Sequence, residues 1–98
     1  MRPRVSGMNE VDDAVLELFD RQDDGIWLSP ALVHWNLTEV YEATDKSKET
    51  VARRMRKLVK RGLLSRMDQR GYYKITKMGR AYLQGDLDAE ELELPDDS

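Results

Sequence analysis

Cysteine is absent from this 98-residue sequence, and histidine and phenylalanine each occur once. Without Cys the chain can form no disulfide, no thiolate metal site and no Cys nucleophile, which suits a reducing compartment. With one His and no glycine-rich phosphate loop, the sequence suggests no cofactor or metal site and no enzyme. No apolar run approaches the roughly 18 residues of a membrane span, and the first residues lack a signal-peptide core. We therefore expect a cytoplasmic protein with no membrane contact and no small-molecule substrate.

Basic residues are concentrated in one part of the chain, although the formal net charge is −3. Residues 46–80 hold 13 Lys or Arg and 2 acids, whereas the remaining residues hold 3 Lys or Arg and 17 acids. Scattered charges would only solvate a surface, but these coincide with one predicted helix and one predicted hairpin. The segregation therefore indicates contact with nucleic acid through a single patch.

The basic segment opens with an amphipathic helix predicted over residues 47–61. Ser47 suits its N-cap and Gly62 the position after its end. Apolar residues at helical spacing should face the core, namely Val51, Met55, Leu58 and Val59. We expect the polar face to contact DNA through Thr50, Arg53, Arg54, Lys57 and Arg61.

A β-hairpin is predicted over residues 63–76, with Arg70 at its tip. Because side chains alternate along a strand, Tyr73 and Ile75 should pack on the helices. Arg70 can reach a phosphate or lie in a minor groove, and the alternative is a solvated turn. The preceding residues 26–28 are too short to stand alone, but they can pair with the hairpin as a third strand.

Two further helices precede the basic one. Asn9 can cap the first, whose apolar stripe is Val11, Ala14, Val15, Leu18 and Phe19. Ser29 followed by a proline starts the second, whose predicted buried stripe is Leu32, Val33, Leu37, Val40 and Tyr41. A short connection at residues 44–46 then leads into the basic helix, which is the helix-turn-helix arrangement. On the second helix we expect His34 to be structural or at the surface. Trp35 on the same helix, and Trp27 before it, should be core or half-buried packing residues.

Thr76 can cap a last helix, whose Met78, Ala81, Tyr82 and Leu83 can cover the core or pair with a second copy. Residues 86–98 hold seven acids and no base, and should be largely disordered. Residues 1–8 are predicted to be a flexible tail, with a minor-groove arm as the alternative. The predicted organisation is therefore a tail at 1–8, a winged-helix domain at 9–85 and an acidic tail at 86–98. The fold class is α+β, mostly helical, with a small antiparallel sheet and a C-terminal helix.

Four motifs taken in order carry a resemblance over roughly residues 10–92: Thr50-Val51 with Arg53-Arg54 and Leu58; Gly62-Leu63; Gly71-Tyr72-Tyr73 with Ile75-Thr76; and Gly79-Arg80-Ala81-Tyr82-Leu83. In these four motifs and their order, the chain resembles small haloarchaeal winged helix-turn-helix proteins related to a haloarchaeal phage repressor. The stretch 38–46 is longer than the tight turn of many relatives. The resemblance implies a winged-helix transcriptional regulator, with the recognition role on Thr50, Arg53, Arg54 and Lys57 and the wing role on Arg70.

The expected mechanism is binding to double-stranded DNA, with the recognition helix in the major groove. Lys46, Lys48, Lys57, Arg61 and the wing would contact phosphates, which fix register without reading sequence. Since one copy gives limited specificity, we expect a homodimer that uses the first and last helices. The alternative is a protein-interaction module of winged-helix fold, which an exposed apolar patch would favour.

Overall fold

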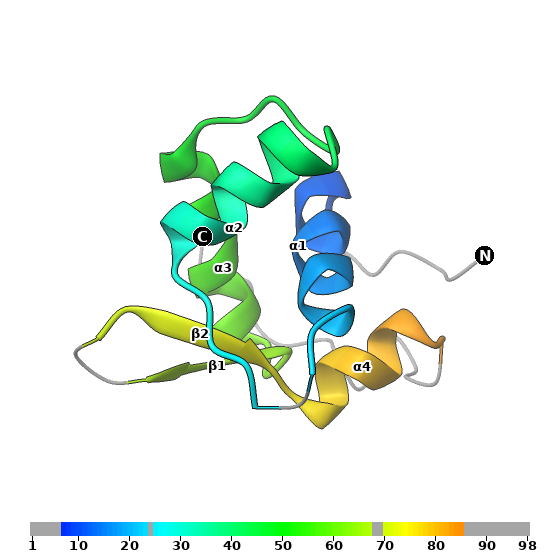
Figure 1. Cartoon of the computed structure of the whole chain (residues 1–98). Coiled ribbons are helices and arrows are strands. Elements are labelled where there is room, and N and C mark those ends of the chain that lie inside the picture. Colours follow the sequence, from blue (N-terminus) through cyan, green and yellow to red (C-terminus); the bar gives the residue numbers. More distant parts are fainter. Residues whose placement is uncertain (1–6, 24, 68–69, 86–98) are drawn as a thin grey trace.

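The structure, a computed structural model, describes residues 7–23, 25–67 and 70–85. Figure 1 shows that the helices before the hairpin pack together, that the hairpin projects from them, and that the last short helix lies at the base of the first. In chain order the elements are α1 (Glu10–Asp20), α2 (Pro30–Trp35), the π-helical turn η1 (Asn36–Val40), α3 (Lys48–Lys60), β1 (Leu64–Met67), β2 (Tyr72–Ile75) and α4 (Lys77–Leu83). The predicted α+β fold, helix-turn-helix followed by a two-stranded wing, is confirmed.

Local capping signals fix where the helices begin. Asn9 Oδ1 accepts from the amide of Asp12 at 3.0 Å, and Asp12 Oδ2 accepts from the amide of Asn9 at 2.9 Å, which is a capping box. Gly62, directly after the C-cap of α3, has a φ of 81°, a conformation that glycine adopts without strain. All four predicted N-caps are confirmed: Asn9, Ser29, Ser47 and Thr76.

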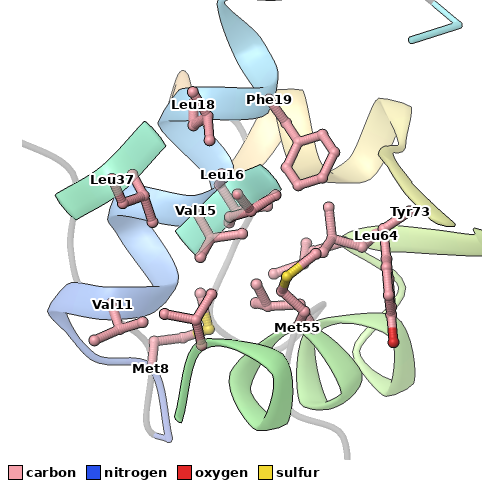
Figure 2. Packing of buried hydrophobic residues seen from close by; sticks show 14 of the residues in the cluster. Met8, Val11, Val15, Leu16, Leu18, Phe19, Leu37, Met55, Leu64 and Tyr73 are labelled. Carbon is pink, nitrogen blue, oxygen red and sulfur yellow. The ribbon is translucent and has the colours of Figure 1, made fainter. Parts of the chain in front are cut away.

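The core lies between α1, α3 and the inner face of the hairpin, as Figure 2 shows. Helix α1 supplies much of it, including Leu16, which the predicted stripe omitted. Met8 also belongs to the core at 7% exposure, although the sequence had placed it in the flexible tail. The buried hydrophobic residues are Met8, Val11, Val15, Leu16, Leu18, Phe19, Val33, Leu37, Val51, Met55, Leu58, Leu63, Leu64, Tyr73 and Tyr82.

The second helix departs most from prediction. Only Val33 and Leu37 of its predicted stripe are buried. The other three are 52%, 50% and 42% exposed, so their assignment to the core was wrong: Leu32, Val40 and Tyr41. At Asn36 the helix widens to a π turn, in which the amide of Tyr41 bonds to the carbonyl of Asn36 at 2.9 Å. Residues three apart no longer align across such a turn, which takes Val40 away from the line of Leu37.

The hairpin has the predicted alternation. Tyr73 is 2% exposed and packs in the core, whereas Tyr72 is 42% exposed. The two strands pair antiparallel, in a register that begins with Leu64 opposite Ile75. The third strand is reduced to one bridge, in which Leu28 and Tyr73 exchange backbone hydrogen bonds of 2.8 and 2.9 Å.

Helix α4 packs along α1 and closes the core. Its Tyr82 is 3% exposed and donates its hydroxyl hydrogen bond to Asp13 Oδ1 at 2.8 Å. Arg80 pairs with Asp20 at 2.6 Å, which ties the middle of α4 to the last residue of α1. Covering the core is therefore the role that α4 has within one chain. The predicted tails, apart from Gly7 and Met8, lie outside the described residues, and the domain boundaries stay predictions.

Candidate nucleic-acid interface

Helix α3 turns one face to the core and the opposite face to solvent. Val51, Met55 and Leu58 are at most 1% exposed and pack against α1 and the hairpin. The exposed side chains of the helix are four bases and one acid: Lys48, Glu49, Arg53, Arg56 and Lys60. All but Lys48 lie opposite the buried row, since Lys48 is seven residues before Met55 and so lies on the side of that row. The solvent face of α3 therefore carries positive charge from Arg53 to Lys60.

Arg54, expected on the DNA-contacting face, points to α1 instead. Its Nε donates to Asp12 Oδ1 at 2.8 Å, and its Nη2 donates to Asp12 Oδ2 at 2.5 Å and to the carbonyl of Gly7 at 2.7 Å. The Arg54 side chain is 12% exposed and that of Asp12 is 0% exposed. Both oxygens of a buried carboxylate thus hold this guanidinium, which is oriented toward the interior and not toward a base edge.

Arg61 also differs from expectation. Arg61 is 8% exposed, and its guanidinium lies so close to Gly7 that a Cβ added to Gly7 would overlap it. Arg54 and Arg61 are seven residues apart and so lie on the same flank of α3. The position of α1 and Gly7 buries that flank, so neither residue presents its charged group to solvent as the DNA-contacting role requires.

Arg56 was missed by the sequence reasoning, as was Lys60. Both are exposed, three and seven residues from Arg53, on the same side of α3. The predicted polar face was centred on the flank that meets α1. Centring it directly opposite Val51, Met55 and Leu58 would have selected Arg56 and excluded Arg54.

The N-terminal end of α3 holds three other predicted site residues: Lys46 and Lys48 are exposed, and Thr50 is half-buried. Lys57, in the last turn of the helix, is also half-buried. Ser47 Oγ donates to Thr50 Oγ1 at 3.1 Å. His34 Nε2 on α2 donates to the carbonyl of Lys46 at 3.0 Å, which confirms the structural role predicted for this histidine. The turn that leads into α3 is therefore tied to the second helix.

The wing adds exposed cations beside α3. Arg70 is exposed at the tip, as predicted, next to Gly71. Arg66 on β1 is exposed as well, and its guanidinium carbon lies 5.7 Å from the centre of the Tyr73 ring. Lys74 on β2 lies 5.1 Å from the ring centre of Trp27, which is half-buried as predicted. Trp35 is 57% exposed, so the packing role expected for it was wrong.

Comparisons with known proteins agree with this geometry. The model of the family described as "Winged helix-turn-helix phage repressor" matches residues 1–95. The chain belongs to this family. It is 33% identical over 95 residues to the "Repressor protein" of Halobacterium phage phiH, covering 95% of this chain and 98% of that one. The crystal structure of the PhiH1 repressor-like protein from Haloarcula marismortui matches with a TM-score of 0.71 and 36% identity, over 91% of each chain.

Membership of the phage repressor family confirms the resemblance seen in the motifs and the winged-helix fold. In the described part of this family member, no three His, Cys, Asp or Glu side chains form a group that could hold a metal ion. Nor does any helix there have the length and apolar character needed to cross a membrane.

Proposed function

We propose that the chain is a transcriptional regulator, a repressor, that binds double-stranded DNA in a sequence-specific manner. The observation that carries the proposal is the solvent face of α3, where Arg53, Arg56 and Lys60 lie opposite the buried row. The family and the phiH relative support a DNA-binding, repressor-like role. The role needs binding and no chemistry.

In this proposal α3 lies in the major groove. Arg53 and Arg56 would donate to guanine O6 and N7, and Thr50 would offer its hydroxyl or methyl group to a base edge. Five basic residues around these base-contacting side chains would contact phosphates: Lys46, Lys48, Lys57, Arg66 and Arg70. Relative to the sequence prediction, Arg56 and Arg66 enter the proposed interface, whereas Arg54 and Arg61 leave it. The acidic remainder of the chain would repel DNA from the other surfaces.

Homodimerisation remains part of the proposal. Each good bidentate contact discriminates by about 1–3 kcal/mol, so two arginines in one copy give limited specificity. A two-fold pair of copies would read two half-sites. Because Tyr82 of α4 is buried within a single chain, the proposed contact between copies would use the outer sides of α1 and α4. Light scattering at two protein concentrations measures the mass of the particle and so tests this part alone.

The test begins with selection of a duplex from a random-sequence pool by the wild-type chain. Fluorescence anisotropy then compares the selected duplex with a scrambled one. We expect the double variant Arg53→Glu/Arg56→Glu to lose the preference for the selected duplex. The matched control, Arg21→Glu/Lys77→Glu, makes the same change in net charge at two exposed positions outside α3 and should keep it. Equal loss in both variants would refute the assignment to α3.

A protein-interaction role is the second candidate, and a specific observation favours it. Leu32, Trp35 and Val40 on α2 and η1 are 52%, 57% and 50% exposed, which is unusual for large apolar side chains in one short segment. A partner protein could bury them while α3 stays on DNA. The test is the double variant Leu32→Ser/Trp35→Ser. If it weakened neither DNA binding nor self-association, the result would favour the binding of a different protein at these side chains.

A further inference from the structure

The ion pair between Asp12 and Arg54 joins the first turn of α1 to the middle of the recognition helix. The Asp12 carboxylate accepts three hydrogen bonds, two from Arg54 and one from the amide of Asn9. The amide of Asp12 donates in turn to Asn9 Oδ1. Among the described residues, every buried side-chain nitrogen and oxygen has a hydrogen-bond partner. The carboxylate is therefore held at both oxygens, and it in turn holds the guanidinium.

This ion pair restricts a rotation of α3 against α1 that the apolar core alone would permit. Apolar contacts between α1 and α3 are non-directional and tolerate small rotations of one helix against the other. A two-point contact between a planar guanidinium and a carboxylate is directional. The third bond from Arg54, to the carbonyl of Gly7, adds a further point of attachment beside the first turn of α1. The rotation of α3 about its own axis is thus set where Arg54 meets Asp12.

Rotation of α3 decides where its solvent face points. A turn of about 20° about the helix axis moves a group about 6 Å from that axis by about 2 Å. Hydrogen bonds to a base edge tolerate only a few tenths of an ångström, since donor and acceptor lie about 2.7–3.2 Å apart. Arg53 is the residue immediately before Arg54, so its position depends on how Arg54 is held. A small error in rotation would therefore cost the base contacts while leaving the positive charge of the surface in place.

We propose that Asp12 is a positioning residue for DNA recognition, acting through Arg54 to set the rotation of α3. The inference rests on the proposed function, because it concerns how α3 meets DNA. Asp12 is 0% exposed and negatively charged, so it cannot itself donate to a phosphate or a base. Its effect on binding must pass through the residue that it holds.

The sign of one substitution separates this role from a purely electrostatic one. Asp12→Asn removes a negative charge, and charge alone predicts tighter binding to DNA. If Asp12 positions α3, the same variant binds the selected duplex more weakly, by about tenfold, with a smaller change on the scrambled duplex. Glu10→Gln is the matched control, since it makes the same charge change at an exposed position two residues away. This control should bind as tightly as the wild type or slightly more so.

A second variant keeps the test independent of folding. The double replacement Asp12→Leu/Arg54→Met leaves the net charge unchanged and fills the site with apolar side chains, an exchange that often preserves stability. We expect it to bind the scrambled duplex as the wild type does, and the selected duplex about tenfold more weakly. Circular dichroism gives the folded fraction by which each affinity is corrected.

The outcomes are distinguishable. A corrected affinity of Asp12→Asn equal to or above that of Glu10→Gln would overturn the positioning role. A double variant that keeps the full preference for the selected duplex would also overturn it. Failure of the wild-type chain to select any duplex would instead overturn the proposed function.

Discussion

Arg53 and Arg54 are neighbours of the same residue type on one helix, but Arg53 is exposed, whereas Arg54 is paired with the buried Asp12. Arg54→Ala removes two of the three hydrogen bonds of the buried Asp12 carboxylate. Breaking a buried ion pair by removing one partner costs about 3–5 kcal/mol. In a domain of this size each kcal/mol lowers the melting temperature by about 4–8 °C, so the expected fall is about 12–40 °C. Arg53→Ala, at an exposed position, should change stability by no more than about 0.5 kcal/mol.

Thermal unfolding followed by circular dichroism at one fixed salt concentration measures both variants. Arg and Ala have similar helix propensities, so the comparison isolates the side-chain contacts. Arg53→Ala should instead affect DNA binding: it should weaken binding to the selected duplex by about 1–3 kcal/mol and leave the melting temperature unchanged. Equal melting temperatures for the two variants would refute the assignment of Arg54 to the ion pair.

Two further predictions concern α4, and one concerns the wing. Gly79→Ala should destabilise the fold by about 1–3 kcal/mol in urea unfolding, because its Cβ would overlap the carbonyl oxygen of Leu63. Thr76→Val should cost about 1–2 kcal/mol, because Thr76 Oγ1 accepts from the amide of Gly79 at 3.0 Å and donates to the carbonyl of Gly62 at 2.7 Å. Arg70→Ala should weaken binding to all duplexes alike and reduce the salt slope by about 1 for each bound copy.

Lys77→Ala, exposed on the same helix, is the control for both α4 variants, and its stability should match that of the wild type. Unfolding of Gly79→Ala at the wild-type urea midpoint would show that α4 does not pack as described. For the wing, a loss of affinity confined to the selected duplex would mean that Arg70 reads sequence.

Elements governed by local chemistry were predictable from sequence. The limits of α3 follow from Ser47 at its start and Gly62 after its end, because capping and glycine conformation depend on few neighbours. The alternation of the hairpin follows from strand geometry, which places Tyr73 inside and Tyr72 outside. The same holds for Thr76 as the cap of α4.

What depended on tertiary neighbours was not predictable. A helical repeat shows that α3 has an apolar face, but only the place of α1 shows that the flank with Arg54 and Arg61 is covered. From the sequence alone, a basic residue on such a flank cannot be distinguished from an exposed basic residue on the surface. The π turn after α2 likewise has no periodic signal, and it left Val40 exposed where a regular amphipathic helix had been expected.

The central claim, that α3 and the wing bind DNA in a sequence-specific manner, is tested most directly by a salt titration of the wild-type chain. Anisotropy is measured with the selected and scrambled duplexes from low to high salt. Five phosphate contacts per copy predict a slope of log affinity against log salt of about −4.5 for one bound copy and about −9 for the proposed pair, and specific recognition predicts that the selected duplex binds at least about 10³ times more tightly. Absence of binding to either duplex at low salt would contradict the account and favour the protein-interaction role.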